Sequence, residues 1–159
     1  MEVRRATRED LPGITGLLYG DYFRDMSALL SPPAITALVE NDFNPATLKR
    51  RVLEGSLVIA EDEDQLLGFA LAGNAGDHIE LRSICTRAEY LHQGVAKRLL
   101  DEIQIIDPTL PVSATVLLGN GPAESFHESQ GFAPGEIVER EVAGQQIVER
   151  RWWRSPDAN

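Results

Sequence analysis

The sequence predicts one mixed α/β (α+β) domain, and three observations support this prediction. The 159 residues match the length of a single domain and can bury roughly 70% of the surface that the unfolded chain exposes. A hydrophobic share of 43% beside 25% charged residues is near the globular average and unlike that of a disordered chain. Segments of period two are interspersed with segments of helical period, so strands and helices are both expected.

The first half of the chain predicts a strand, two or three helices and a hairpin. Thr7 resembles a helix N-cap, and the apolar residues that follow it recur at helical spacing. Ser31-Pro32-Pro33 and Asn44-Pro45 are expected to interrupt the chain, and Gly55 to end a helix. In order, we expect a strand over 2–6, a helix after Thr7, short helices over 34–40 and 46–53, a strand over 56–60, a turn at 61–64 and a strand over 65–72.

The second half predicts alternating strands and helices that end in a hairpin. One helix is strongly amphipathic, a second is ended by Gly131, and Ala143-Gly144 separates the last two strands. No repeat, linker or low-complexity stretch divides the chain, so we expect one domain over 1–155 and a short tail over 156–159. The expected strands are 78–86, 111–117, 136–142 and 146–153, and the expected helices are 93–106 and 122–130.

Charge and composition exclude several classes of partner and location. Asp and Glu number 25 against 15 Lys and Arg, and the one basic cluster, residues 149–154, is short; nucleic acid is therefore not an expected partner. An acidic field favours the approach of cations such as amines. No apolar run approaches the ~20 residues of a membrane span, so no membrane association is expected. A single cysteine, Cys85, and an N-terminus without a signal peptide indicate a reducing cytoplasm and no multi-cysteine metal site.

The most informative stretch, Ile84 to Leu100, reads as a strand, a tight loop and a helix whose first turn holds small residues. A helix N-terminus presents unpaired N–H groups and a partial positive charge. Gly94 and Ala96 would let a bulky anion approach this backbone, which suggests a phosphate or pyrophosphate site. A close-packed strand–helix turn is the alternative reading of the same residues.

This stretch resembles the acetyl-CoA signature of the GNAT N-acetyltransferase superfamily. Glu89-Tyr90 fits the family's loop, and Gly94 and Ala96 fit its two small positions, whereas Leu91 stands where Arg or Gln is usual. The resemblance implies a central mixed, mostly antiparallel, splayed sheet flanked by about four helices, and acetyl-CoA as co-substrate without a metal. It assigns cofactor contacts to Ile84, Cys85, Thr86, Leu91, His92, Gln93, Gly94, Val95, Ala96 and Lys97. Lys97 is equally well explained as a solvated residue on the helix surface.

A second resemblance lies downstream and includes the whole segment Asn120 to Phe132. Asn120, Ala123, Phe126 and Gly131-Phe132 match the family's Asn-x-x-Ala-x-x-Phe-Tyr-x-x-x-Gly-Phe pattern. Asn120 also suits a strand–helix junction as a cap or amide donor. In the family this Asn contacts the pantetheine arm, so Asn120 is another expected cofactor residue.

For the catalytic base, the strand 78–86 offers a polar row. Alternation places His78, Glu80 and Arg82 on one face with Ile84, and Ile79, Leu81, Ser83 and Cys85 on the other, core face. Family enzymes often carry a Glu base on this strand, so Glu80 is the expected base, with an ion pair to Arg82 or His78 as its structural alternative. Arg82 and His78 are expected substrate contacts, and a backbone N–H near Ile84 and Cys85 is the expected oxyanion donor.

For the acid that protonates the leaving thiolate, the family's usual Tyr position is occupied by His127. His127 could replace that acid, or it could be a solvent-facing helix residue. Cys85 is expected to be a core thiol and not a nucleophile. Tyr22 lies in the region that walls the acceptor site in the family, although its helical spacing also suits a core residue.

The predicted function is direct acetyl transfer from acetyl-CoA to a primary amine of a small molecule or peptide. Two alternatives have different predicted properties. A non-catalytic acyl-CoA-binding module would bind ligand without releasing CoA thiol. A structural dimer formed through the last strands, which contain Trp152 and Trp153, would bind no acyl-CoA. The acceptor's identity depends on the variable region 19–53.

Overall fold

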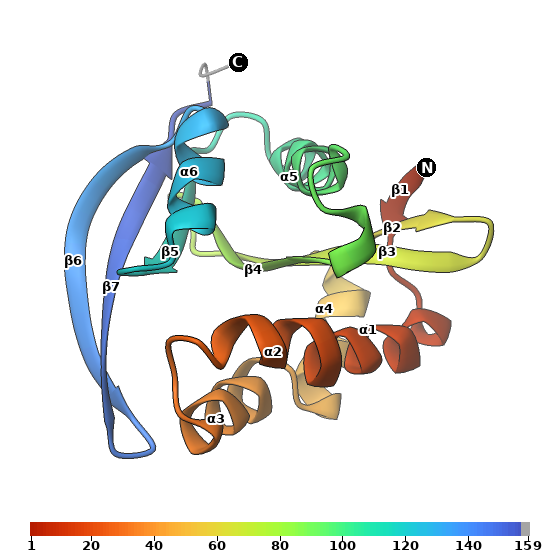
Figure 1. The fold of residues 1–159 in the computed structure, drawn as a ribbon. Helices are drawn as coiled ribbons and strands as arrows, with labels where there is room; N and C mark the ends of the chain where they lie inside the picture. The colour runs from red at the N-terminus through yellow and green to blue at the C-terminus, as the bar shows by residue number, and fades with distance from the viewer. Residues whose placement is uncertain (157–159) are drawn as a thin grey trace.

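The computed structural model describes residues 1–156, which form one seven-stranded sheet with helices on both faces (Figure 1). The strand order is β1-β2-β3-β4-β5-β7-β6. Among the described strands, β4 and β5 run parallel and all other neighbours are antiparallel. The predicted α/β domain with a mixed, mostly antiparallel sheet is confirmed. Residues 157–159, in the tail expected over 156–159, lie outside the described part.

Every strand and helix expected from the sequence is present, with ends shifted by a few residues. Helices α1–α4 cover one face of the sheet and α5 and α6 the other (Figure 1). The strands are β1 (Glu2–Arg5), β2 (Leu57–Asp62), β3 (Gln65–Asn74), β4 (Ile79–Thr86), β5 (Val112–Leu117), β6 (Ala133–Val142) and β7 (Gln145–Arg154). The helices are α1 (Leu11–Leu17), α2 (Phe23–Met26), α3 (Pro32–Asp42), α4 (Pro45–Glu54), α5 (Val95–Ile106) and α6 (Gly121–Ser129), with a π-helical turn (Leu18–Tyr22) between α1 and α2.

The prolines that were expected to interrupt the chain instead begin helices. The Ser31 side chain accepts a hydrogen bond from the Ala34 N–H at 3.3 Å, and Asn44 accepts one from the Thr47 N–H at 2.9 Å. Each is an N-cap followed by proline, whose missing N–H would have no helical partner and whose φ already suits a helix. Helix α3 therefore starts at Pro32, two residues before its expected start.

The β2–β3 and β6–β7 hairpins each turn on two residues. The turn between β2 and β3 consists of Glu63 and Asp64, both with positive φ (47° and 66°), whereas four residues, 61–64, were expected. Ala143 and Gly144 turn β6 into β7 with φ of 49° and 81°. Two consecutive left-handed residues twist a hairpin in the same sense as its strands.

The apolar residues form two cores, one on each face of the sheet. On the face of α1–α4, Phe69, Leu71 and Ile147 pack against these helices. On the other face, Leu99, Leu100 and Ile103 of α5 are fully buried against the sheet. Two fully covered faces explain why the central strand β3 is buried for seven consecutive residues, where an exposed face would show alternation.

A β-bulge in β4 corrects the expected division of its faces. Leu71 pairs with Ser83 but the next residue of β3 pairs with Leu81, so Arg82 is an extra residue in β4. An extra residue reverses the alternation beyond it. Leu81 accordingly packs in the α5 core and Cys85 in the opposite one. Ile79 and Leu81 share the α5 face as predicted, but the prediction that Cys85 lies on the same face was wrong.

Candidate active site

The sheet divides between β4 and β5. The two parallel strands pair only from Ile79–Leu81 to Val112–Ala114. From Arg82 to Thr86, β4 has no partner strand on its β5 side within residues 1–156. Backbone groups on this side of β4 are therefore free to bind other molecules, because a strand can satisfy them only with a neighbour.

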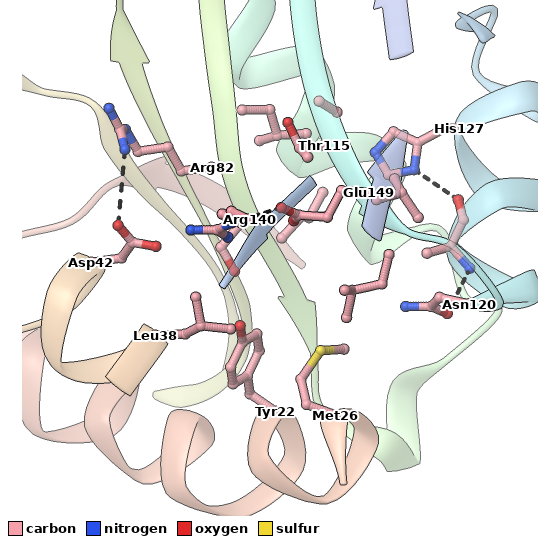
Figure 2. A pocket seen from close by; sticks show the side chains of 17 residues that line it. Tyr22, Met26, Leu38, Asp42, Arg82, Thr115, Asn120, His127, Arg140 and Glu149 are labelled. Carbon is pink, nitrogen blue, oxygen red and sulfur yellow. Dashed lines mark hydrogen bonds and ion pairs between the residues drawn. The ribbon is translucent and has the colours of Figure 1, made fainter. Parts of the chain in front are cut away.

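A cavity of about 150 Å³ occupies this gap and joins the two faces of the sheet. Leu38 of the α1–α4 core and Val116 of the α5 core both line it. Figure 2 shows Tyr22 and Met26 reaching it from the α1–α2 region, and Asn120 and His127 from the side of α6. Two molecules that enter from opposite faces could therefore meet in the gap.

On the α5 face, the chain between β4 and α5 ends in an open helix N-terminus, at the place where the sequence predicts an anion site. Gly94 is the N-cap of α5 with φ of 82°, and a Cβ built on it would meet nothing within 4 Å. The first intrahelical bond of α5 is donated by Arg98 to the Gly94 carbonyl, so the N–H groups of Val95, Ala96 and Lys97 have no helical acceptor. The helix N-terminus is thus open to a phosphate.

The other expected cofactor residues surround this N-terminus. Ile84, Cys85 and Thr86 end β4, and Gln93 donates its side-chain amide to the Glu89 carbonyl. Leu91 is 49% exposed, and the backbone of His92 lies in the left-handed region with φ of 62°. Lys97 makes an ion pair with Asp101 at 2.9 Å, an exposed pair that a ligand phosphate could replace at little cost.

Asn120 and His127 belong to α6 and its cap. The Asn120 side-chain oxygen accepts the Ala123 N–H at 3.3 Å, which leaves its NH₂ group as a donor at the cavity wall. His127 is 4% exposed, and its Nδ1 lies 2.7 Å from the Ala123 carbonyl oxygen. A carbonyl can only accept, so Nδ1 carries the proton, and Nε2 of the neutral ring holds a lone pair. Nε2 is buried without a hydrogen-bond partner among residues 1–156.

His127 is therefore buried, and the alternative reading of a solvent-facing histidine was wrong. Its ring packs edge-on against Phe126 and Phe132, with centroids 5.3 and 5.1 Å away. Burial lowers the pKa of His127 below its ordinary 6.5, because a charged ring would lose its hydration. The neutral ring is thus the resting form at neutral pH.

The depressed pKa of His127 predicts a pH dependence of stability. Below about pH 6.5 the unfolded chain binds a proton that the native state resists, so the free energy of unfolding should fall as pH drops from there. His127→Gln removes this contribution. Urea unfolding at about pH 7.5 and about pH 5 measures the effect. Between these two pH values, the free energy of unfolding should fall further in wild type than in His127→Gln. An equal loss in both proteins would contradict the buried neutral ring.

On the α1–α4 face, the cavity has polar walls from several elements. Tyr22 lines it, and burial, followed by the nearby Asp42 charge, raises the pKa of Tyr22 to about 12. Arg82 lies 3.9 Å from Asp42 in a loose ion pair. Arg140 of β6 donates from Nε to Glu149 of β7 at 2.8 Å. Glu149 belongs to the short basic cluster of the sequence and was not expected at the cavity; the period-two pattern of β7 was the signal that could have indicated it.

Of the five expected catalytic and substrate residues, two lie outside the cavity lining. Glu80 lies in the part of β4 that pairs with β5, and its carboxylate is 3.6 Å from Arg82. This is the ion pair that was expected if Glu80 has a structural role. The Nδ1 atom of His78 lies within hydrogen-bond distance of Asp77 Oδ1, at 2.6 Å, and its ring packs edge-on against Trp153. Glu80 as base and His78 as a substrate contact therefore remain predictions.

Cys85 is buried in the α1–α4 core, and burial raises the pKa of its thiol to about 12. A thiol reacts as the thiolate, so this environment agrees with the expected core role. Across residues 1–156, no cluster of three His, Cys, Asp or Glu side chains could hold a metal ion. None of the described helices is long and apolar enough to cross a bilayer.

The sequence model of a family described as an acetyltransferase (GNAT) domain matches residues 54–134. Among solved structures, the PaiA N-acetyltransferase of Thermoplasma acidophilum in complex with coenzyme A has a TM-score of 0.77 at 18% identity, covering 97% of this chain and 98% of that one. The ribosomal-protein-alanine N-acetyltransferase of Brucella melitensis has a TM-score of 0.76 at 22% identity, covering 98% and 99%.

A third similar structure is YncA, a putative acetyltransferase of Salmonella typhimurium with its cofactor acetyl-CoA, at a TM-score of 0.73, 19% identity and coverage of 99% and 95%. A search of curated proteins found no significant match. At these identities the structures establish a shared fold, and the family model spans both β4 and α5, which border the split in the sheet.

Proposed function

The chain belongs to the GNAT acetyltransferase family, and we propose that it transfers an acetyl group from acetyl-CoA directly to a primary amine. The observation that carries the proposal is the cavity through the split sheet. Its lining combines Ile84 and Ala123, which pack against the α5 core, with Tyr22 and Leu38, which pack in the α1–α4 core. Donor and acceptor would enter from opposite faces and react where β4 and β5 diverge.

The residues on the α5 face fit a coenzyme A thioester. Two phosphates carry several acceptor oxygens, and the free N–H groups of Val95, Ala96 and Lys97 supply donors at the positive end of a helix. The NH₂ group of Asn120 suits a pantetheine amide carbonyl. Two of the similar proteins were solved with coenzyme A or acetyl-CoA bound, which supports the same ligand here.

The chemistry then depends mainly on position and polarisation. Acetyl-CoA supplies the activated acetyl group. An N–H on the free edge of β4, near Ile84 and Cys85, would donate to the thioester carbonyl oxygen and stabilise its developing negative charge. Holding two reactants in one cavity can contribute ~7–11 kcal/mol, more than general acid–base help from one side chain.

His127 is proposed to protonate the departing thiolate, but its resting form changes how it would do so. Nε2 of the neutral ring has no proton to give, because Nδ1 holds it against the Ala123 carbonyl. His127 must therefore first accept a proton in the cavity before it passes one to sulfur. The histidine is thus a relay, whereas a tyrosine hydroxyl carries its own proton.

The acceptor is proposed to be a small-molecule or peptide amine. The net charge of −10 favours cations, and Tyr22, Leu38 and Asp42 in the variable region form part of the wall. The single, buried cysteine suits a reducing compartment, so we propose a cytoplasmic protein.

Calorimetric titration with acetyl-CoA tests the proposal, with desulfo-CoA and adenosine as controls. Binding that requires the pyrophosphate is expected, followed by amine-dependent release of CoA thiol across a panel of amines. Binding without thiol release from any amine would favour a non-catalytic acyl-CoA module. No binding at millimolar ligand would favour a structural protein, such as a homodimer formed through β6 and β7.

A further inference from the structure

Glu149 is the buried carboxylate of the cavity wall. Its side chain is 10% exposed, and it points from β7 to the face of α1–α4, beside its cross-strand neighbour Leu117. Both residues line the cavity. Burying a carboxylate is costly unless its oxygens are paired, so a carboxylate at this position requires an explanation.

Only one oxygen of Glu149 is paired within the described chain. Arg140 Nε donates to Oε1 at 2.8 Å, and no hydrogen bond to Oε2 occurs among residues 1–156. Arg140 is 44% exposed and also lines the cavity, so its bond to Oε1 orients the carboxylate and leaves Oε2 available to a ligand. A ligand group beside Oε2 must be a hydrogen-bond donor, because an ionised carboxylate can only accept.

The other charged groups at the cavity are less suited to hold an ammonium group there. Asp42 is 26% exposed and has Arg82 beside it at 3.9 Å. Glu80 is 35% exposed, shares the same arginine at 3.6 Å and does not line the cavity. Glu149 thus combines burial, a place in the cavity and a free oxygen.

We propose that the Glu149 carboxylate binds the acceptor's ammonium group and takes the first proton that the amine must lose. This inference rests on the proposed acetyl transfer and names the base within the same site. The acceptor class is a primary ammonium slender enough to reach Oε2 past Tyr22 and Met26.

The proton and electron balance is complete. The ammonium transfers one proton to Glu149 and becomes a neutral amine, whose lone pair forms the C–N bond to the acetyl carbon. The C–S bond breaks and its electron pair leaves with sulfur. The nitrogen, positively charged on attack, gives its second proton to the thiolate through His127 or water. Glu149 then releases its proton to solvent.

Four variants test the assignment by amine-dependent thiol release. Glu149→Gln keeps the size and polarity of the side chain, and should lower kcat about 10²- to 10⁴-fold, the range for general acid–base groups, with acetyl-CoA affinity unchanged. Arg140→Gln is the matched control, because it breaks the same ion pair and keeps the carboxylate; it should cost only a few-fold. Glu80→Gln tests the rival base predicted from the sequence: if Glu149 is the base, this variant should cost only a few-fold and keep the wild-type pH profile. Asp42→Asn alters the cavity wall and should act on the KM for the amine, not on the pH profile.

Equal losses in Glu149→Gln and Arg140→Gln would make the ion pair structural and overturn the proposal. So would full activity of Glu149→Gln beside a strong loss in Glu80→Gln, which would make Glu80 the base. If Glu149→Gln does not fold, Glu149→Asp replaces it: a shortened carboxylate should retain measurable activity with a raised KM for the amine, and an unchanged KM would contradict the subsite.

A binding measurement separates this inference from the proposed function. Butylammonium is titrated into wild type and Glu149→Gln, each saturated with CoA, and followed by NMR. If butylammonium binds to wild type and not to Glu149→Gln, the subsite is supported. If wild type at the same time transfers no acetyl group, the proposed function fails and the subsite stands. Equal binding to both proteins, or none to wild type, overturns the subsite whatever the activity.

Discussion

Replacing Gly94 with valine is expected to weaken acetyl-CoA binding about ten- to a hundred-fold, the loss of one or two charge-assisted hydrogen bonds. Gly94 caps α5 in the left-handed region, and the space where its side chain would stand is empty. A valine there would occupy the approach of the phosphates to the N–H groups of Val95 and Ala96. Calorimetric titration with acetyl-CoA measures the effect.

Gly144→Val is the matched control for this experiment. Gly144 has φ of 81° against 82° for Gly94, and a Cβ at either position meets nothing within 4 Å. Both variants should therefore lose similar stability from backbone strain, ~1–3 kcal/mol. Only Gly94→Val should lose affinity. If both variants bind acetyl-CoA like wild type, the N-terminus of α5 is not the phosphate site.

Replacing Gly68 with alanine is expected to destabilise the fold by ~2–3 kcal/mol, a melting temperature lower by roughly 5–10 °C. A Cβ on Gly68 would lie 2.5 Å from the Cys85 carbonyl oxygen and 3.3 Å from the Thr86 Cα. These are backbone atoms of β4, so the strands must separate. Because β4 bears the expected oxyanion donor, acetyl-CoA affinity should fall as well.

Gly16→Ala is the opposite case and serves as the control. Gly16 lies in α1, and a Cβ there meets nothing within 4 Å. Alanine is the better helix former by up to about 1 kcal/mol, so this variant should be more stable than wild type. Urea unfolding measures both free energies. A Gly68→Ala protein as stable as wild type would mean that β3 and β4 can separate at no cost.

Much of the fold was predictable because its signals are local. The left-handed Gly55 at the end of α4 and the amphipathic pattern of α5 each depend on residues within one or two turns. The expected ends were less accurate where two readings of one residue compete. Pro32 can interrupt a chain or begin a helix, and only the hydrogen bond from Ala34 to Ser31 decided between them.

The loop before α5 and the cap of α6 were also predictable, since each is continuous in sequence; their contacts with a cofactor stay a prediction. The arrangement of side chains on the α1–α4 face was not predictable. Arg82 becomes an extra residue of β4 through its pairing with β3, and period-two reasoning cannot anticipate a bulge that another strand imposes. That single residue reverses the faces that had been assigned to the rest of the strand.

The sequence by itself determined the family, the order of the strands and helices and the glycine-capped start of α5, because each depends on neighbouring residues with a fixed local geometry. Tertiary structure alone decided which side chains meet in the gap. Glu149 and Arg140 come from adjacent strands, and Tyr22 reaches the same cavity from 127 residues earlier than Glu149. Tertiary structure also decided the protonation state of His127, because it buries the ring and places the Ala123 carbonyl oxygen 2.7 Å from Nδ1.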